Sequence, residues 1–489
     1  MIWQTPLLHD RIRGSITGAI ESPSCETAFF RYYLAIRASS WITVLPTTLA
    51  STRLPICVKL DRQPLCKPQL ESTDAMNRNQ QLQDSTAPTQ RICQRTRFCK
   101  QGQIHWVSWI LIISLAVLIE PNLSAEQAGQ KAATAGPQAT TSQWPLFRGD
   151  PLSTGVAHGE LPAKPSLLWK HKVKDGAFEA TAAIVENTVY VGDLDGTFYA
   201  LDLNTGKPKW TFTTKDKDGF YASPAVYQQR VYVGDLFGRF YCLDAATGKK
   251  LWEFETKAEI DSSANFYRGN VLVGSQDATL YCLESASGKL IWKHTIEDQI
   301  RCTPTVVDAR CFVAGCDGKL HIIDLEKGVS VANVDIGGPT MATPAVRGDL
   351  AYFGSESGTF FCVNWKQANV VWRYEPKRGR GVRSSAAASD KIVIYGNRSR
   401  EVRGMHPVSG KQLWTFNTKQ RVDSSPIIVG QRAFVGSSDG RLYGLNLQTG
   451  KKEWEYEAGG GFAASPAVAA GKLVIATDDG VVYCFGKQP

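Results

Sequence analysis

The sequence predicts an all-β protein, an eight-bladed β-propeller of four-stranded blades. Three observations predict it: a tryptophan that recurs about every 40 residues, four short strand patterns in each repeat, and glycine-bearing turns between them. Four strands in a repeat of about 40 residues are typical of a propeller blade. The repeats place the propeller in residues 144–489, which hold 38 of the 43 glycines.

One tryptophan marks the same position in almost every repeat. Successive members are separated by 41, 42, 40, 80, 42 and 40 residues, and Ala332 stands midway in the long interval. A large aromatic side chain at a fixed position is expected to fill the seam between neighbouring blades. The seven are Trp169, Trp210, Trp252, Trp292, Trp372, Trp414 and Trp454.

One repeat illustrates the expected order of elements. The inner strand is predicted at Tyr221–Val226, and the following strands at Arg230–Gly234, Arg239–Leu243 and Leu251–Phe254. The turn before the outer strand reads Asp-Ala-Ala-Thr-Gly, residues 244–248. Its aspartate can accept hydrogen bonds from amides two residues on, and its glycine can take a positive φ without steric cost.

The ring is expected to close through an N-terminal strand. Eight inner strands can be counted, yet the last repeat stops after its third strand, Val481–Phe485, and Leu167–Lys170 carries a tryptophan strand with no blade before it. We expect the early strand to complete the last blade, which removes a free sheet edge. The segment Trp144–Asp150 is predicted to cap that blade, with an exposed peptide ligand as the alternative.

The residues before the propeller are assigned to export. Residues 1–103 show no sustained apolar period and are interpreted as disordered or as preceding the true start, for which Met76 is a candidate. Residues 104–125 contain a basic-flanked apolar run, 106–119, which predicts a signal peptide or an uncleaved anchor. With 126–143 as a linker, the propeller is expected in the periplasm or cell envelope.

Charge favours partners other than nucleic acid. The whole chain carries +9, but residues 126–489 hold 42 Lys and Arg against 38 Asp and Glu. A nearly neutral domain outside the cytoplasm has little to attract a nucleic acid. The propeller is expected to be monomeric.

The repeat resembles the pyrroloquinoline quinone enzyme repeat. The resemblance rests on Ala200-Leu-Asp-Leu-Asn-Thr-Gly-Lys-Pro-Lys-Trp210 and Leu445-Asn-Leu-Gln-Thr-Gly-Lys-Lys-Glu-Trp454, and it covers about 345 residues. Quinoprotein dehydrogenases, the propeller lipoprotein of the bacterial outer-membrane assembly machine and sensor domains of bacterial Ser/Thr kinases share this repeat. The chain is similar to the lipoprotein in blade number but lacks a cysteine after its small-residue segment. Function therefore has to be argued from the sites.

The resemblance implies a possible cofactor, which the sequence disfavours. In the dehydrogenases pyrroloquinoline quinone lies on the propeller axis between a tryptophan and a disulfide of adjacent cysteines, with calcium nearby. This chain has no two adjacent cysteines, and the Asp193–Asp195 loop is interpreted as a turn rather than a calcium site. We assign no catalytic residue, no metal and no cofactor. A disulfide between Cys302 and Cys316 is left open, and the third-strand cysteines are interpreted as small buried hydrophobes.

The residue two places before each inner-strand Ser or Thr differs from blade to blade. These residues are predicted to ring the mouth of the central channel, where they could bind a small polar ligand or a peptide end. Pairing with one another or with channel water is the alternative. The ligand candidates are Glu179, Tyr221, Asp261, Arg301, Arg383 and Asp423.

Blade six carries a cluster of basic residues in two loops that are expected to share one face. Such a patch could contact an acidic protein, a cell-wall polymer or lipid head groups, or it could be an ordinary solvated surface. Its members are Lys377, Arg378, Arg380, Arg398, Arg400 and Arg403.

The leading hypothesis is a non-catalytic binding or scaffold propeller outside the cytoplasm. Its loop faces and basic patch would contact another envelope protein or an acidic polymer. The alternatives are a quinone-dependent oxidoreductase and a ligand-sensing propeller similar to the kinase ectodomains.

Overall fold

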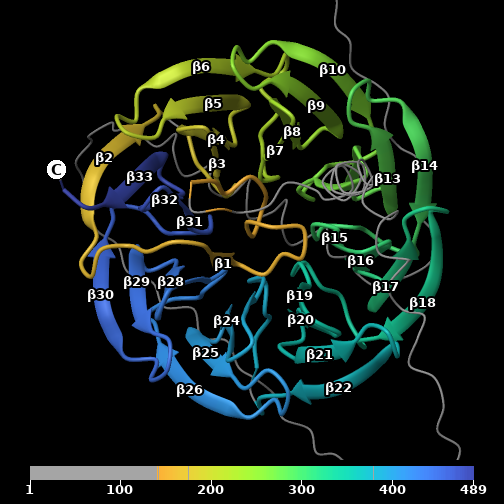
Figure 1. Cartoon of the computed structure of the whole chain (residues 1–489), viewed down its shortest axis with the longest axis vertical. Helices are drawn as coiled ribbons and strands as arrows, with labels where there is room; N and C mark the ends of the chain where they lie inside the picture. The colour runs from red at the N-terminus through yellow and green to blue at the C-terminus, as the bar shows by residue number, and fades with distance from the viewer. Residues whose placement is uncertain (1–139, 141, 175, 378, 489) are drawn as a thin grey trace, which may run out of the picture. The chain divides into compact units, whose positions relative to one another are not determined.

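The structure, a computed structural model, describes residues 140, 142–174, 176–377 and 379–488. Eight sheets follow one another around a ring, which confirms the predicted all-β, eight-bladed propeller (Figure 1). Among these residues no helix is long and apolar enough to cross a membrane. The predicted disordered and export segments, residues 1–125, and nearly all of the linker lie outside the described residues.

Each blade has four antiparallel strands, ordered from the axis outward. Blades one to four comprise β3 (Ala183–Val185), β4 (Thr188–Gly192), β5 (Thr197–Asp202) and β6 (Pro208–Thr213); β7 (Ala225–Tyr227), β8 (Arg230–Gly234), β9 (Arg239–Asp244) and β10 (Lys250–Glu255); β11 (Asn265–Tyr267), β12 (Asn270–Gly274), β13 (Thr279–Glu284) and β14 (Leu290–Thr295); β15 (Thr305–Val307), β16 (Arg310–Ala314), β17 (Lys319–Asp324) and β18 (Val329–Asp335).

The second half of the ring repeats the pattern. Blades five to eight comprise β19 (Ala345–Arg347), β20 (Leu350–Gly354), β21 (Phe360–Asn364) and β22 (Asn369–Tyr374); β23 (Ala387–Ala388), β24 (Val393–Asn397), β25 (Glu401–Met405) and β26 (Gln412–Asn417); β27 (Ile427–Val429), β28 (Arg432–Gly436), β29 (Arg441–Asn446) and β30 (Lys452–Glu457); β31 (Ala467–Ala469), β32 (Lys472–Ala476), β33 (Val481–Gly486) and β2 (Ser166–Lys172).

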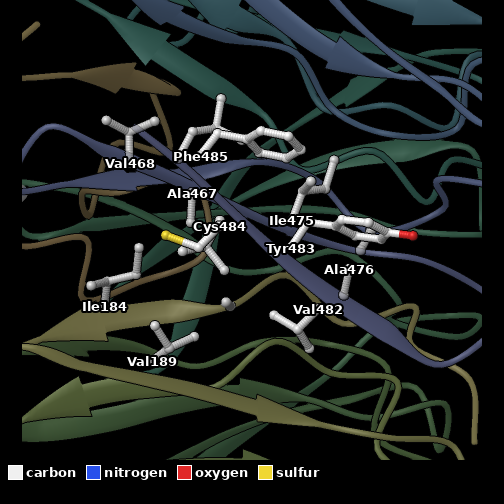
Figure 2. Close-up of a cluster of buried hydrophobic side chains, with 14 of the residues drawn as sticks. Ile184, Val189, Ala467, Val468, Ile475, Ala476, Val482, Tyr483, Cys484 and Phe485 are labelled. Carbon is white, nitrogen blue, oxygen red and sulfur yellow. The ribbon is translucent and has the colours of Figure 1, made fainter. Parts of the chain in front are cut away.

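The predicted closure by an N-terminal strand is confirmed. β2 pairs antiparallel with β33, placing Trp169 opposite Cys484 as the outer strand of blade eight. The Trp169 indole N–H then donates to the Leu203 carbonyl of blade one at 2.9 Å. Figure 2 shows the apolar side of the same seam, where Val482 and Cys484 of β33 face Ile184 and Val189 of blade one. First and last blades are therefore joined by both polar and apolar contacts.

The inner strands are shorter than predicted. The sequence predicts an inner strand at Tyr221–Val226, whereas β7 spans only Ala225–Tyr227. Pro224 has no N–H for a strand ladder, and the Ser223 amide donates outside its own sheet, to the Ser263 hydroxyl at 2.9 Å. Sheet pairing therefore begins only after the proline.

This amide-to-hydroxyl contact recurs in every blade and forms a closed ring around the axis, which we call the hydroxyl ring. Each member's backbone N–H donates to the side-chain oxygen of the next member, at 2.9–3.3 Å, and all eight are buried. The last bond runs from the Ser465 N–H to Thr181 Oγ1 at 3.1 Å and closes the circle. The members are Thr181, Ser223, Ser263, Thr303, Thr343, Ser385, Ser425 and Ser465.

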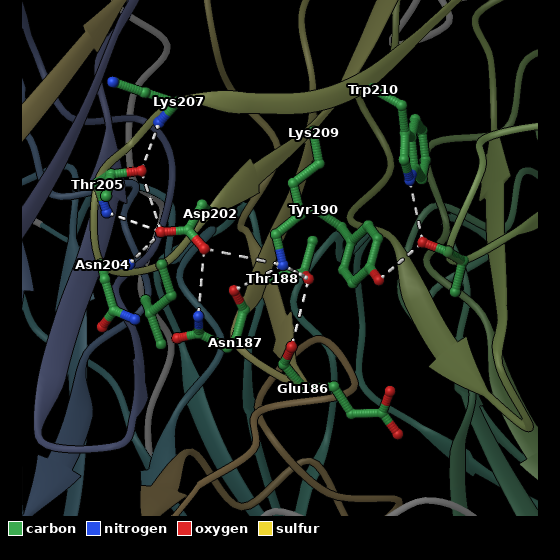
Figure 3. A network of polar contacts seen from close by, with 12 residues as sticks. Glu186, Asn187, Thr188, Tyr190, Asp202, Asn204, Thr205, Lys207, Lys209 and Trp210 are labelled. Atoms are coloured by element: carbon green, nitrogen blue, oxygen red, sulfur yellow. Dashed lines mark hydrogen bonds and ion pairs between the residues drawn. The ribbon is translucent and has the colours of Figure 1, made fainter.

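The repeated tryptophans fill the blade seams, as predicted. The Trp210 indole N–H donates to the Ala245 carbonyl of blade two at 3.0 Å, and Tyr190 donates to the same oxygen at 3.1 Å (Figure 3). The Asp202 carboxylate in Figure 3 accepts the Asn204 and Thr205 amides and so shapes the turn. Each such turn lies over the tryptophan of the preceding blade.

The turn glycine is required by both space and backbone. Gly206 has a φ of +70°, and a Cβ there would lie 2.5 Å from the Trp169 ring. Any side chain would thus be strained twice, by the left-handed backbone and by the indole. The Asp-x-x-Thr-Gly turn is therefore part of the blade-to-blade contact as well as a chain reversal.

Blade four, where Ala332 replaces the tryptophan, is compensated across its seam. The following turn carries Ala368, with a φ of +51°, where other turns carry glycine. Its Trp365 packs edge-on against Phe312 of blade four, with ring centroids 5.5 Å apart. Ala332, Trp365 and Ala368 all pack on one apolar cluster. A tryptophan from blade five thus takes over the role of the missing one.

The segment before the first blade, residues 144–157, which we call the leader, does more than cap the closing blade. Trp144 is fully buried and shares a cluster with Ile184 of blade one and Val468 of blade eight. From there the leader runs across the ring (Figure 1), and its last two residues form β1 (Val156–Ala157), parallel to β27.

The leader satisfies the inner edges of most blades. Its carbonyls accept the inner-strand amides of six blades at 2.8–2.9 Å, and Pro151 O also accepts the Asn265 side chain of blade three. The Arg148 guanidinium is buried and donates to carbonyls of Ala386, Ser425 and Pro426. Burial lowers its pKa to about 9, so it stays charged at neutral pH. The leader therefore plugs one end of the channel.

The described cysteines are free thiols. Cys302 Sγ accepts the Ala314 amide at 3.3 Å, and Cys316 is buried without a disulfide, so the bridge left open between them is not formed. Cys242, Cys282 and Cys484 are buried in third strands, as predicted. Burial raises the pKa of each of these three thiols to about 12.

We predict that Ser223→Ala destabilises the propeller by about 1–3 kcal/mol, because it leaves the buried Thr181 amide without an acceptor. Ser223→Thr is the control, since threonine serves at three positions of the hydroxyl ring. Urea unfolding followed by tryptophan fluorescence measures both. Equal unfolding midpoints for the two variants would count against the ring.

We also predict that Ala332→Trp destabilises the protein by about 1–3 kcal/mol through overpacking beside Trp365 and Ala368. Restoring the standard seam with Ala368→Gly and Trp365→Leu in the same chain should recover most of that loss. The measurement is the unfolding midpoint in urea for the single and triple variants. A triple variant no more stable than the single one would refute the compensation.

Candidate functional site

The two faces of the ring carry different loops. Because neighbouring strands run in opposite directions, the turn between the second and third strands lies on the same face as the connection into the next inner strand. We call this the mouth face. The opposite face carries the Asp-x-x-Thr-Gly turns and the end of the channel that the leader plugs.

The candidate ligand residues do converge at the mouth, where most are paired. Asp261 and Arg301 form a buried ion pair, Nη2 to Oδ2 at 2.6 Å. Asp423 accepts both Arg398, at 2.9 and 3.0 Å, and Arg421 at 2.9 Å. These carboxylates are therefore paired with arginines from neighbouring loops and, for Arg421, from the same loop.

Arg383, the other arginine among the ligand candidates, pairs with an acid that is not one of those candidates. Its Nε lies 2.7 Å from Glu356 Oε1, on a loop of blade five. Pairing of the candidates with one another, the alternative, is therefore seen for Asp261 and Arg301, whereas Arg383 and Asp423 pair with residues outside the predicted set.

Glu179 and Tyr221 lie in the electrostatic field of these groups. Burial raises the pKa of Glu179 from 4.5 to about 7, and the carboxylates of Asp423, Asp478 and Asp261 push it the same way. Burial also raises the pKa of Tyr221 well above its usual value. Among the ion pairs of the described residues, none includes Glu179, and the acids around it oppose its ionisation.

A cavity of about 680 Å³ opens beside the mouth, between blades five, six and seven. We call it the arginine pocket, since four arginines and one glutamate give it a strongly positive lining. Two of its loops are tied together, because the Arg398 amide donates to Gly381 O at 3.0 Å and the Arg380 amide to Ser399 Oγ at 3.1 Å. The lining residues are Glu356, Arg380, Gly381, Arg398, Arg400, Gln420 and Arg421.

The structure divides the predicted basic patch. Arg380, Arg398 and Arg400 line the arginine pocket, and Lys377 is exposed on the same loop as Arg380. Arg403 lies elsewhere: it is buried, paired with Glu401 at 2.6 Å and stacked over the Tyr374 ring. Arg378 lies outside the described residues. The patch is thus smaller than predicted and part of it lines a cavity.

Four lining residues were not predicted from the sequence: Glu356, Gly381, Gln420 and Arg421. The repeat register contained a signal for one of them. Arg421 stands four places before Ser425, as Gly381 stands four places before Ser385, so the two occupy equivalent loops of neighbouring blades. Aligning the loops, rather than only the mouth residues, would have placed Arg421 beside the patch.

The described residues do not fit the quinone site that the resemblance implies, in which the cofactor lies on the axis between a tryptophan and a disulfide of adjacent cysteines. All seven described cysteines are free and buried in the blades, and the seam tryptophans lie on outer strands, away from the axis. The Asp193 carboxylate accepts the Asp195 and Thr197 amides at 3.0 and 2.8 Å and the Tyr199 hydroxyl at 2.8 Å. These bonds support its interpretation as a turn residue.

Comparison with known families agrees with this fold. Residues 162–264, 236–398 and 398–488 match the family described as outer membrane protein assembly factor BamB. The chain belongs to this family. No curated protein matches the chain by sequence.

Solved structures similar to this BamB-family chain include a BamB protein and several dehydrogenases. BamB from Moraxella catarrhalis is 20% identical with a TM-score of 0.56, over 66% of this chain and 98% of that one. The quinohemoprotein alcohol dehydrogenase from Comamonas testosteroni is 15% identical with a TM-score of 0.62, over 75% and 85%. A europium-containing methanol dehydrogenase is 12% identical with a TM-score of 0.57, over 71% and 98%. At these identities the likenesses show the fold alone.

We predict a pH dependence of stability that originates at Glu179. Its pKa is higher in the folded than in the unfolded chain, so the folded state holds an extra proton between pH 4.5 and about 7 and loses stability as the pH rises through that range. Glu179→Gln should remove up to about 3 kcal/mol of this loss at pH 8 and change little near pH 4.5. Urea unfolding at several pH values measures it. A difference between the two proteins that does not vary with pH would contradict the assignment.

Proposed function

We propose that this protein is a non-catalytic binding propeller of the cell envelope, and that its mouth face contacts a partner protein. Membership of the family described as an outer membrane protein assembly factor supports a role in the envelope. The observation that carries the proposal is the arginine pocket, a cavity with four arginines on the face that the leader leaves open. Arginine is among the residues that most often dominate protein interfaces.

A second feature of the mouth face supports a protein partner. Phe237, in the turn between β8 and β9, is 69% exposed. The equivalent position carries Asp or Ser in the other seven blades, for example Asp277 and Ser357. An exposed aromatic ring in a polar turn has no packing role of its own, and such rings are common anchors at interfaces.

The pairing of the mouth acids supports binding rather than acid–base chemistry. Asp261 and Asp423 each accept hydrogen bonds from arginine, so their carboxylate oxygens already have partners within the protein. A general base has to lie within hydrogen-bond reach of the proton that it removes, and oxygens already bonded to arginine are poorly placed for that. Glu179 differs from these two acids because its pKa is raised to about 7. Among the described residues, however, no hydrogen bond or ion pair joins its side chain to a nucleophile or to a second acid–base group.

We predict that the two faces differ in what they touch in the cell. A photo-crosslinking amino acid placed at Phe237 of the full chain should yield a specific crosslinked protein in the cells that produce it. The matched control is Val408, which is 63% exposed on the opposite face and should yield none. Crosslinks from Val408 but not from Phe237, or from neither, would contradict the proposal.

A further inference from the structure

We propose that the arginine pocket binds an acidic peptide segment, and that Arg380 and Arg400 hold its carboxylates. This rests on the proposed function and deepens it by giving the chemistry of the partner.

Two of the four pocket arginines are already committed. Arg398 binds Asp423 through two parallel hydrogen bonds, and Arg421 binds the same carboxylate. Arg380 and Arg400 are exposed at the cavity and form no ion pair with any acid in the described part of the chain. These two guanidinium groups therefore have donors left for a ligand.

Arg400 occupies a position that the fold reserves for glycine. The turn between the second and third strands ends in glycine with positive φ in six blades, and in Ala278 in blade three. Arg400 stands there in blade six with a φ of +68°. A residue other than glycine is strained in the left-handed region, and strain of this kind is concentrated at functional sites. The turn itself gains nothing from a guanidinium, whereas the pocket does.

The loop that carries Arg380 is bonded to the loop that carries Arg400. Gly381, next to Arg380, lies so close to Glu356 that a Cβ would be 2.9 Å from Glu356 Oε2. The Arg380 amide is bonded to Ser399, which precedes Arg400. The backbones that carry both arginines are thus fixed relative to each other, so less freedom is lost when a ligand binds.

The geometry favours a carboxylate carried on a chain. The planar guanidinium fork matches a carboxylate with two parallel bonds, as Arg398 and Asp423 already demonstrate in this pocket. The free arginines lie at the exposed rim, so a ligand has to reach them from the mouth face. An extended peptide with several Asp or Glu side chains can bind both arginines at once from that direction.

The test is fluorescence anisotropy of the full-length protein with two labelled octapeptides, one with four glutamates and one with glutamine at the same places. The glutamate peptide is expected to bind at least tenfold more tightly. Arg400→Gly should weaken its binding at least fivefold while the melting temperature stays the same or rises, because glycine relieves the strained φ. The matched control is Arg268→Gly, another positive-φ arginine, in a turn on the opposite face, which should leave binding unchanged.

Three results would overturn the inference. Equal weakening by Arg268→Gly would mean nonspecific charge attraction, and an unchanged affinity in Arg400→Gly would place the peptide elsewhere. If inorganic phosphate or citrate displaced the peptide at concentrations below the peptide's own dissociation constant, the pocket would be a small-anion site. Crosslinking from Phe237 separates this inference from the proposed function. If a partner is captured at Phe237 but the glutamate peptide does not bind, only the inference is refuted. If the peptide binds but no partner is captured, only the proposed function is refuted.

Discussion

The hydroxyl ring is the constraint on which the rest of the propeller depends. Each Ser or Thr amide is turned toward the next blade, so it is lost to its own sheet and the inner strands shrink to three residues or fewer. On one side of the ring the short strands leave amides that the leader carbonyls accept. On the other side the preceding residues, such as Glu179 and Arg301, are left at the mouth. One contact thus separates the plugged end from the open end.

The seams between blades are the second contact that repeats around the ring. In the standard seam a tryptophan lies under a turn glycine, with no room for a Cβ. At the fourth seam the tryptophan is lost, and Ala368 and Trp365 have changed with it, so that Phe312 still meets an indole ring. An indole ring is therefore present at this seam as well, supplied by blade five instead of blade four, as expected where interiors are close-packed.

The repeat made the fold predictable from the sequence. Contacts that occur in one blade only, or that lie outside the repeat, could not be predicted in the same way. Tryptophan spacing and the missing outer strand were sufficient for blade number and closure. The path of the leader was only partly predicted, because its bonds are to backbone amides far away in the chain and leave no periodic pattern. Arg403 was predicted in the patch, yet it belongs to β25 and its side chain is buried beside Glu401. A count of basic residues ignores strand alternation, which decides which of them reach the surface.

The same repetition explains how a site can arise on this scaffold. A strained residue costs on the order of 1–3 kcal/mol, which is large for a single turn. In blade six the cost falls on one of eight equivalent hairpins, while the hydroxyl ring and the seams are unaffected by the residue at that position. Positions that serve only their own hairpin are therefore the ones free to differ, and both Arg400 and Phe237 occupy such positions. Binding residues are therefore expected at positions where one blade differs in sequence from the other blades and where the difference removes no contact to a neighbouring blade.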